Sequence, residues 1–552
     1  MDERRRIESL RHSHGEVENE LFDEYLAERI SRRELLRRAA LLGVSLPLVG
    51  SAVGGVAAAA ERPASRVRHV AGKPVKVGIV TPTGDINPLT VADQGGLDML
   101  AQTGEYLCLS NQKLMLVPVL ATKWSANKKA NIWTFKIRQG VKFNNGAPLT
   151  ADDVVYTYQL HTNPKNGSAA LSAFKGVLSP SGVKKVDSHT VAFHLQAPNG
   201  NFPYLCSSDN YNMIIIPNGY DPTKWQSSFV GTGPWVMKSY TAKVGATFTP
   251  NPNYWATPPK PSEADFTFFA TATPSVLALE GGTIDVLGQF AVQGGEALLT
   301  GNYNVITLRS SAHRELSMRC DQKPFNDPRV RQAVALTLDR SAIVKALFKG
   351  KSDLGNDTPF APVFPSTASL TQREKNISKA KSLLHAAGHS HGFSAKLYTE
   401  EFLEIPDFAQ IIKQSAAAIG VNISLHVETS SAYYGKATFG NSDWLDGEMS
   451  LVDYGHRAVP NVFLTAPLET GGPWNAAHFK NSNYDKLVSE YVAAVGVSSQ
   501  RSLAKKIETL LLNETPIIYA YFYNYLSATA KNVSGAYPTA IGHIFVNNCT
   551  VA

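Results

Sequence analysis

The segment spanning residues 117–160 constrains the fold of this 552-residue chain most strongly. Apolar and polar residues alternate from residue 133 to residue 138, which is the period of a strand with one buried face. Asn145-Gly146 then supplies a tight turn. Thr150 stands three residues before Asp153, which is the spacing of a capping box at the start of a helix. The segment therefore predicts a β-hairpin followed by a helix.

A second pattern indicates the fold class. Residues 396–398 have the composition of a strand, residues 407–419 that of a helix ending at Gly420, and residues 421–427 that of another strand. A helix between two strands predicts a parallel βαβ unit, because parallel neighbours need a long crossover connection. We therefore expect an α/β fold.

Length and composition limit the class of protein. The chain is too long for one ordinary domain, and its 43% apolar and 18% charged residues are typical of a globular protein with more than one core. The formal net charge is +7, a mild excess with no long basic run beyond the N-terminus. Such an excess relates to solubility, so we expect no nucleic-acid partner.

The N-terminal residues resemble an export signal. Arg32 and Arg33 lie in the string Ser-Arg-Arg-Glu-Leu-Leu-Arg, which is similar to a twin-arginine motif. Residues 39–60 carry no charge and end in alanines that suit a cleavage site. About 20 uncharged residues could also span a bilayer, but the glycines and the proline of this stretch favour a cleavable signal. We therefore expect residues 1–60 to be a leader, and the rest to lie in the periplasm or on the outer face of the cell membrane. No cysteine in or just after this stretch indicates a lipoprotein tether.

Four cysteines lie in the expected exported part, at Cys108, Cys206, Cys320 and Cys549. They show no Cys-x-x-Cys spacing, so we expect no zinc site. An even number of cysteines in an exported chain permits disulfides, with three possible pairings. Disulfides and buried free thiols therefore both remain open.

Three common catalytic or nucleotide-binding motifs are missing from the sequence. HExxH, a Walker loop and GxGxxG are all absent. His389 and His391 could bind a metal, but their glycine neighbours Gly388 and Gly392 favour a solvated loop. We therefore expect a protein that is not an enzyme and has neither a cofactor nor a metal.

Several strings resemble one family. They are the hairpin segment described above and three further strings: Gly-Thr-Gly-Pro-Trp at 231–235, Asn-Pro-Asn-Tyr-Trp at 251–255, and PFNDPRVRQAVALTLDRSAIVKALFKG at 324–350. Together they resemble the family 5 extracellular solute-binding proteins of ABC importers, which include dipeptide, oligopeptide, nickel and some sugar binders. The resemblance covers nearly everything from residue 73 to residue 552.

These strings also have a local explanation. Glycine and proline set the turn at 231–235, and we expect Tyr254 and Trp255 to be buried packing anchors. Asp327 and Asp339 each stand where a helix should begin, so each predicts an N-cap.

The resemblance implies a periplasmic-binding-protein-like fold (type II, cluster C) with three lobes. Lobe I would comprise residues 73–104, 229–310 and 516–552, lobe II residues 105–228, and lobe III residues 311–515. The ligand would bind in the cleft between lobes I and III and favour its closed state.

The resemblance also suggests where a ligand binds. In peptide-binding members, an aspartate in a Trp-x-x-Asp-Tyr string pairs with the α-ammonium group of the ligand, and Asp453 falls on that position. A charge-assisted hydrogen bond in a dry cleft would hold such a ligand tightly. Ser450 replaces the tryptophan, which enlarges the pocket or argues against a peptide, and Trp444 and Trp474 are possible substitutes. Tyr454 either packs or touches the ligand.

Arg314 is a further candidate. It follows the expected crossing from lobe I to lobe III, where it could receive a ligand carboxylate bidentately, although a surface arginine is the commoner outcome.

These features predict a monomeric, extracytoplasmic binding protein that delivers its ligand to the membrane permease of an ABC importer, with peptides as the first expectation. A binder of a sugar, an opine or a metal chelate is the first alternative, since Ser450 departs from the peptide pattern. An exported hydrolase or chaperone is the second, because a fold alone does not specify function.

Overall fold

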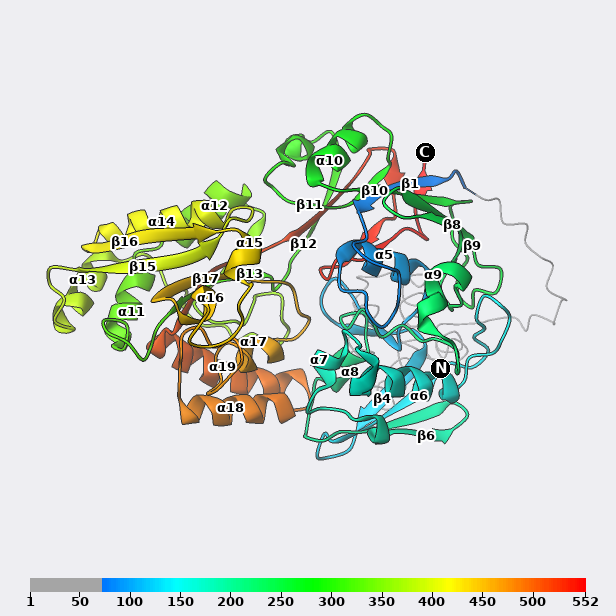
Figure 1. Ribbon diagram of the computed structural model, residues 1–552, viewed down its shortest axis with the longest axis horizontal. Coiled ribbons are helices and arrows are strands. Elements are labelled where there is room, and N and C mark those ends of the chain that lie inside the picture. The colour runs from blue at the N-terminus through cyan, green and yellow to red at the C-terminus, as the bar shows by residue number, and fades with distance from the viewer. Residues whose placement is uncertain (1–71) are drawn as a thin grey trace, which may run out of the picture. The chain divides into compact units, whose positions relative to one another are not determined.

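The computed structural model describes residues 72–552. The predicted export signal, with Arg32 and Arg33, lies outside these residues. None of the described helices combines the length and the apolar character that a membrane span requires. The described chain contains several sheets with helices packed on them, which confirms the predicted α/β class (Figure 1).

A seven-stranded mixed sheet organises one part of the chain. Its strands, in spatial order, are β12 (Asn304–Leu308), β19 (Tyr525–Thr529), β11 (Val286–Phe290), β1 (Val75–Val80), β10 (Ala264–Phe269), β9 (Gly245–Pro250) and β8 (Trp235–Thr241). Strand β1 runs parallel to β10 and β11, and the other neighbours are antiparallel. Helices α5 (Gln94–Thr103) and α10 (Ala272–Glu280) pack on this sheet in two separate apolar clusters.

A six-stranded sheet organises a second part. Its strands, in spatial order, are β14 (Ser352–Leu354), β18 (Ile517–Tyr523), β13 (His313–Met318), β17 (Met449–Tyr454), β15 (Phe393–Glu400) and β16 (Val421–Glu428). Strand β15 runs parallel to both β16 and β17. Helix α14 (Ile405–Ala417) connects β15 to β16, so the predicted βαβ unit is confirmed.

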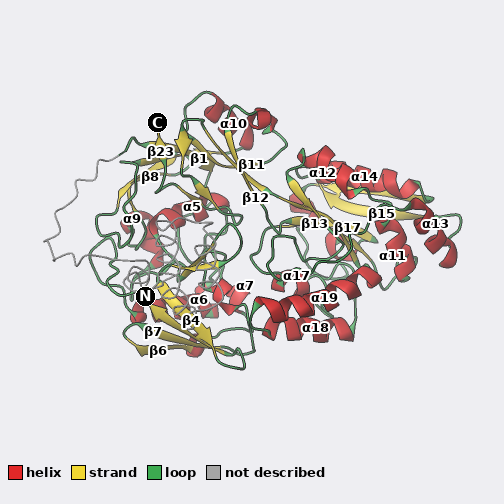
Figure 2. Cartoon of the chain, turned by 180° about the vertical axis from the view of Figure 1, so that it is seen from behind, coloured by secondary structure: helices red, strands yellow, loops and turns green. Residues whose placement is uncertain are grey.

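Helices cover both faces of the six-stranded sheet (Figure 2). On one face lie α11 (Pro328–Ala335), α12 (Arg340–Phe348), α13 (Ile377–Ala386) and α14, and on the other lie α15 (Ser430–Tyr433), α16 (Asp443–Asp446), α17 (Asn461–Thr465), α18 (Ser482–Ala493) and α19 (Val497–Glu514). Successive strand residues therefore point alternately into two apolar cores, as the pleat of a strand requires.

Both helix starts predicted within residues 324–350 are confirmed. Asp327 caps α11 by accepting a hydrogen bond from the amide of Arg329 at 2.8 Å, with Pro328 as the first helical residue. Asp339 caps α12 by accepting from the amide of Ala342 at 3.0 Å. The two caps satisfy amides that a helix start leaves without an internal partner.

Two paired stretches of chain join the two sheets (Figure 1). Strand β12 pairs antiparallel with β19 in the seven-stranded sheet, and β13 pairs antiparallel with β18 in the six-stranded sheet. Between these ladders, the amide of Tyr523 donates to the carbonyl of Ala312 at 2.9 Å. Residues 304–318 and 517–529 thus form one two-stranded ribbon, here called the crossing ribbon.

The crossing ribbon divides the third segment expected for lobe I. Residues 516–552 were assigned to that lobe, but β18 pairs with β13 and β14 of the six-stranded sheet, and only β19 joins the seven-stranded sheet. The chain therefore changes sheet near Asn524 and not at residue 516. The division into three lobes stays a prediction.

The hairpin segment forms a sheet of its own. Its strands, in spatial order, are β4 (Ala121–Ala126), β5 (Ile132–Ile137), β7 (Thr190–His194) and β6 (Val183–Asp187). The predicted alternation is confirmed, because Trp133, Phe135 and Ile137 are buried. The predicted capping box of Thr150 and Asp153 is also present, at the start of α6 (Ala151–Thr162).

Short elements complete the described chain. They are the strand pairs β2 (Cys108–Ser110) with β3 (Leu116–Pro118), β20 (Val533–Ser534) with β23 (Thr550–Val551), and β21 (Tyr537–Pro538) with β22 (Ile544–Phe545), and the helices α7 (Leu171–Phe174), α8 (Phe202–Leu205) and α9 (Trp225–Ser228).

The Gly-Thr-Gly-Pro-Trp turn crosses the end of α5 at a distance that only glycine permits. A Cβ on Gly231 would lie 2.0 Å from the carbonyl oxygen of Thr103, and a Cβ on Gly233 would lie 2.6 Å from the carbonyl carbon. The amide of Gly233 donates to that carbonyl at 3.0 Å. The two glycines therefore allow a close approach between backbones.

The Asn-Pro-Asn-Tyr-Trp string corrects a prediction. Tyr254 and Trp255 are half-buried and not fully buried. The Tyr254 hydroxyl donates to Oε1 of Glu105 at 3.2 Å, and Trp255 Nε1 donates to Oε2 at 2.8 Å. Burial raises the pKa of Glu105 to about 7, although these hydrogen bonds and the charge of Arg138 lower it. The two aromatic residues therefore serve as donors to a buried acid.

All four cysteines are free. Cys108, Cys206 and Cys549 are buried and Cys320 is half-buried. Burial raises the pKa of each of these thiols. Of the two alternatives left open by the sequence, the structure therefore shows thiols, and these thiols are poorly nucleophilic.

Replacing Glu105 by Gln tests the effect of the buried acid on stability. Because the folded-state pKa is raised to about 7, the stability that Glu105 contributes is complete below its unfolded-state pKa and is lost as the pH rises through 7. Gln has the shape of the neutral acid. We therefore expect Glu105→Gln to match the parent near pH 4.5, and to exceed its unfolding free energy at pH 8 by at most about 3 kcal/mol.

Urea unfolding at these two pH values measures this difference. Glu263→Gln is the control, since Glu263 forms an exposed ion pair with Lys238 and exposed pairs contribute little to stability. If Glu105→Gln and the parent differed in unfolding free energy by the same amount at both pH values, the raised pKa of Glu105 would be contradicted.

Candidate ligand-binding site

Arg314 and Asp453 meet across neighbouring strands. Strand β13 pairs antiparallel with β17, and the register places Arg314 opposite Asp453. The two residues are 139 positions apart in the sequence, and Arg314 Nη1 donates a hydrogen bond to Asp453 Oδ1. The structure therefore brings together two of the predicted site residues on one face of the six-stranded sheet, Arg314 within the crossing ribbon and Asp453 on the neighbouring strand.

Arg314 is buried and paired on two sides. Its side chain is 1% exposed, and its Nε lies 2.9 Å from Oε1 of Glu404 without a well-aligned hydrogen bond. Its Nη2 donates to Oε2 of Glu404 at 3.3 Å. The guanidinium lies over the ring of Tyr523, 4.4 Å from the ring centroid. These contacts engage the donors of Arg314 within the protein, so they do not favour the predicted role as a receptor of a ligand carboxylate.

The charge of Arg314 is held by its surroundings. Burial alone lowers its pKa, but Tyr523, Asp453 and Glu404 outweigh burial and raise the pKa above its ordinary value. A charge this deeply buried is tolerated only while its partners remain, because an unpaired buried ion is strongly unfavourable. The ion pairs are thus a structural requirement of the site.

Asp453 is the member of this cluster that reaches solvent. Its side chain is 28% exposed. Its Oδ1 accepts from Arg314 and from the Tyr523 hydroxyl, the latter at 3.4 Å. Within residues 72–552, no donor is hydrogen-bonded to Oδ2. One carboxylate oxygen is therefore available to a ligand.

Two further acids give the site a negative balance. The Tyr434 hydroxyl donates to Glu400 at 3.0 Å and accepts a hydrogen bond from the amide of Asp453 at 3.1 Å. Glu400 and Glu404 are both buried. The cluster contains one arginine, which is paired with Asp453 and Glu404, and three carboxylates in all, so its formal charge is negative. It lies at the carboxyl ends of the parallel strands β15 and β17, a common place for binding sites in α/β sheets.

Ser450 and Tyr454 point to the opposite face of β17, because strand residues an odd number apart alternate between faces. Ser450 is fully buried, and Tyr454 is 8% exposed. Tyr454 stacks on His313 with ring centroids 5.5 Å apart, and Trp474 lies against Tyr454 at 5.9 Å. The contacts of Tyr454 are thus packing contacts.

Trp444 supports the site indirectly. It is buried on α16, and its Nε1 donates to the carbonyl of Lys436 at 3.1 Å. Its ring packs edge-on against Tyr434, with centroids 5.7 Å apart. Trp444 therefore positions Tyr434, whose hydroxyl contacts the backbone of Asp453.

The sequence predictions missed Glu400, Glu404, Tyr434 and Tyr523. The two acids could have been predicted, because an acidic stretch follows the predicted strand 396–398 and the end of a strand lies at the edge of its sheet. The two tyrosines carried none, because their positions relative to Asp453 depend on contacts between distant parts of the chain.

One group of described residues could hold a metal ion. Ligand atoms of His426, Glu428 and Asp443 lie within 4.8 Å of one another at the end of β16 and the start of α16. Burial and the nearby carboxylate of Asp443 raise the pKa of Glu428. His426 and Asp443 are exposed, and such groups are common on protein surfaces without a metal. His389 and His391, for which the sequence favoured a solvated loop, are not part of this group.

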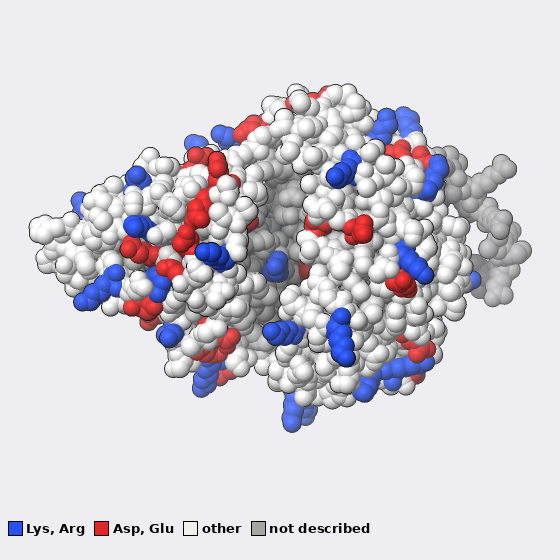
Figure 3. Space-filling view, in the orientation of Figure 1, with Lys and Arg blue, Asp and Glu red and all other residues white. Residues whose placement is uncertain are grey.

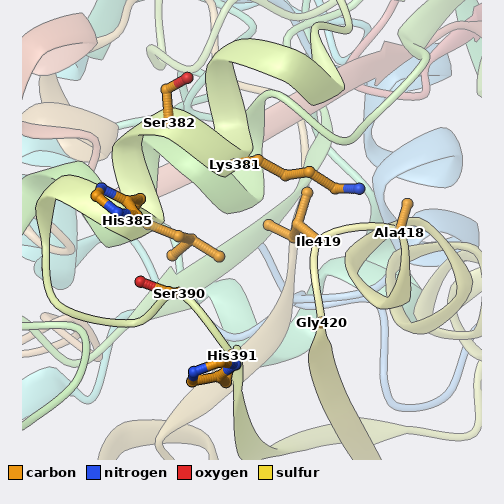
Figure 4. Close-up of a pocket in the computed structure, with 9 residues that line it drawn as sticks. Lys381, Ser382, His385, Ser390, His391, Ala418, Ile419 and Gly420 are labelled. Carbon is orange, nitrogen blue, oxygen red and sulfur yellow. The ribbon is translucent and has the colours of Figure 1, made fainter.

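A surface pocket of about 600 Å³ lies at the other end of the same sheet (Figure 4). It is lined by residues of α13 and of the loops that precede β15 and β16, including Lys381, His385, His391 and Gly420. It contains no carboxylate and lies at the amino ends of the parallel strands. The carboxyl end, with Asp453, therefore has the better chemistry for a charged ligand.

One face of the molecule is hollowed. On the face seen in Figure 3, a recess runs beside the region of α14 and α15, and acidic side chains gather over that region. The crossing ribbon lies between the regions that border this recess (Figure 1).

Comparisons with known proteins agree with this arrangement. The family model described as "Bacterial extracellular solute-binding proteins, family 5 Middle" matches residues 115–466. The dipeptide-binding protein DppE of Bacillus subtilis (strain 168) is 26% identical over 468 residues, which cover 77% of this chain and 82% of DppE. The periplasmic murein peptide-binding protein MppA of Escherichia coli (strain K12) is 26% identical over 490 residues, which cover 83% and 87%.

The same architecture is found among solved structures. The unliganded open form of MppA, the periplasmic murein tripeptide-binding protein, matches with a TM-score of 0.74 at 21% identity, over 87% of this chain and 97% of that one. This likeness confirms the periplasmic-binding-protein-like fold that the sequence resemblance implied.

Replacing Arg314 by Met tests whether the buried cation stabilises the site. Met has a similar length and no charge, so Asp453 and Glu404 would lose their partner. We expect the free energy of unfolding to fall by about 3–5 kcal/mol, measured by urea unfolding near neutral pH.

Arg309→Met is the matched control, because Arg309 pairs with Asp353 with half of its side chain exposed. We expect that substitution to lower stability by no more than about 1 kcal/mol. Equal losses of unfolding free energy for the two variants would contradict the stabilising role of the buried ion pairs of Arg314.

Proposed function

The chain belongs to the bacterial extracellular solute-binding proteins of family 5, and we propose that it captures peptides outside the cytoplasm and delivers them to the permease of an ABC importer. DppE and MppA, which are similar along most of the chain, are named for binding dipeptides and murein peptides. The structural observation that carries the proposal is Asp453, whose Oδ2 is available beside a cluster of negative formal charge.

Asp453 would bind the α-ammonium group of the peptide. An ammonium group at Oδ2 makes a charge-assisted hydrogen bond, which is stronger than a neutral one. Glu400 and Glu404 add negative potential behind it, and Arg314 and Tyr523 hold Oδ1 in place. The carboxylate is therefore oriented before the ligand arrives, which reduces the ordering that binding requires.

The crossing ribbon would serve as the hinge. A ligand that contacts both sheets binds better to the closed state and shifts the population toward it. The closed, ligand-bound form then docks on the permease as a monomer. In this proposal the leader with Arg32 and Arg33 directs export.

A different solute is the second candidate, and Arg314 is the observation that favours it. Because Arg314 is already paired with one oxygen of Asp453, that carboxylate offers an ammonium group a weaker effective charge than an unpaired aspartate would. Ser450 is buried where peptide binders have a tryptophan. A sugar, an opine or a metal chelate fits this weaker charge. An exported hydrolase or chaperone is the least supported candidate, since the family consists of binding proteins.

A ligand screen tests the proposal. The full chain is unfolded and refolded to remove any carried ligand, and its melting temperature is measured with di- to pentapeptides, sugars and metal chelates. A ligand that binds only the folded state raises the melting temperature. We expect peptides with a free amino terminus to raise it and their N-acetylated forms to have no effect.

Asp453→Asn tests the proposed contact. We expect it to weaken peptide binding by about tenfold to a hundredfold, the range of one hydrogen bond to a charged group, measured by calorimetric titration. Asp353→Asn is the matched control, because Asp353 is also paired with an arginine, Arg309, but does not belong to the site. Responses to sugars or chelates without any response to peptides would remove the peptide assignment.

A further inference from the structure

Arg457 is a cation that the crossing ribbon holds in place. Its amide donates to the hydroxyl of Ser311 at 2.9 Å, and that hydroxyl donates to the carbonyl of Arg457 at 2.7 Å. Ser311 is fully buried within the ribbon. Arg457 Nη1 donates to the carbonyl of His456 at 2.8 Å. The backbone of Arg457 and one end of its guanidinium are therefore fixed.

The Arg457 side chain lies close to residues from two parts of the chain. It is exposed, yet partial removal from water lowers its pKa, and Tyr211, Asp209, Tyr523 and Tyr454 lie close enough to affect that pKa. Two of these neighbours follow the hairpin sheet in the sequence, and the other two belong to the six-stranded sheet. Arg457 therefore stands where these two parts of the chain come close.

The donors of Arg457 lack an ionic partner. In the part of the chain from residue 72 onward, no carboxylate is within ion-pairing distance of Arg457. Asp209 is close enough to act on its charge but is engaged by the Ser207 hydroxyl at 3.1 Å. Burial raises the pKa of Asp209 to about 7, so near neutral pH this acid is only partly charged.

The neighbouring His456 adds an unused donor. Its Nδ1 accepts from the amide of Ser311 at 3.1 Å, and burial lowers its pKa to about 3. The neutral ring therefore carries its proton on Nε2. That nitrogen is buried and has no hydrogen-bond partner among the described residues. The stretch after β17 thus contains one cation without an ionic partner and one buried N–H without an acceptor, both counted within the described residues.

We propose that Arg457 binds an anionic group of the ligand, a carboxylate in the first place, so that Asp453 and Arg457 together select a ligand that carries both charges. This inference rests on the proposed function and adds a specificity residue to it. A guanidinium matches the geometry of a carboxylate with two parallel hydrogen bonds. Arg314 does not fill this role, because its donors are already paired with Asp453 and Glu404.

The alternative role for Arg457 is an ion pair with Asp209 that forms on closure and has no ligand contact. The two roles predict different responses to the ligand's charge. A closing ion pair would affect every ligand alike, whereas an anion receptor affects only ligands with a free carboxylate.

Calorimetric titration of the refolded full chain separates the two roles. The probe is the peptide with the largest thermal shift in the screen, used as the free acid and as its C-terminal amide. We expect the unchanged protein to prefer the acid by tenfold or more. We expect Arg457→Gln to lose at least tenfold in affinity for the acid and to keep its affinity for the amide within threefold. Asp209→Asn, the control for the ion pair, should leave both affinities within threefold.

Equal losses for acid and amide in Arg457→Gln, or equal affinities for both in the unchanged protein, would overturn the proposal. If the unchanged protein binds no peptide, the proposed function fails by itself, and succinate and glucose become the probes. A melting shift with succinate that Arg457→Gln abolishes would still support an anion receptor. No response to succinate would overturn it.

Discussion

The crossing ribbon is the constraint on which the rest of the structure depends. Strands β12 and β13 pair with β19 and β18, so the two large sheets share one antiparallel ladder with a short break. The register of this ladder places Arg314 next to β17 and Tyr523 above its guanidinium. Ser311, at the break, also fixes the backbone of Arg457. The hinge and the site are therefore built from the same residues.

The electrostatics of the site follow from two arginines in different environments. Arg314 is buried, and its carboxylate partners keep it charged and immobile. Arg314 holds Asp453 in place. Removing Asp453 or Glu404 would leave part of the buried charge of Arg314 without compensation, which is unfavourable. Arg457 is exposed and has no ionic partner among the described residues. A cation without a partner is free to interact with a ligand, whereas a paired cation is a part of the scaffold.

The family strings have structural roles away from the ligand. The two glycines of Gly-Thr-Gly-Pro-Trp let one backbone pass close to another. Tyr254 and Trp255 hold the buried acid Glu105. Asp327 and Asp339 cap two helices. These strings therefore identify the family by its scaffold, while the residues that would distinguish one ligand from another lie outside them, near Asp453 and Arg457.

The sequence by itself determined the elements, because a strand period, a capping box or an N-cap depends on residues within a few positions of one another. The alternating strand β5, the helices α6, α11 and α12, and the βαβ unit were all predicted in this way. Asp453 and Arg314 were also identified as candidates, but their relation was not. Only the tertiary structure decided that Arg314 is paired with Asp453 across 139 residues and with Glu404 across 90. Such contacts depend on strand register and on the face of the sheet that each residue occupies, and no local pattern specifies either one.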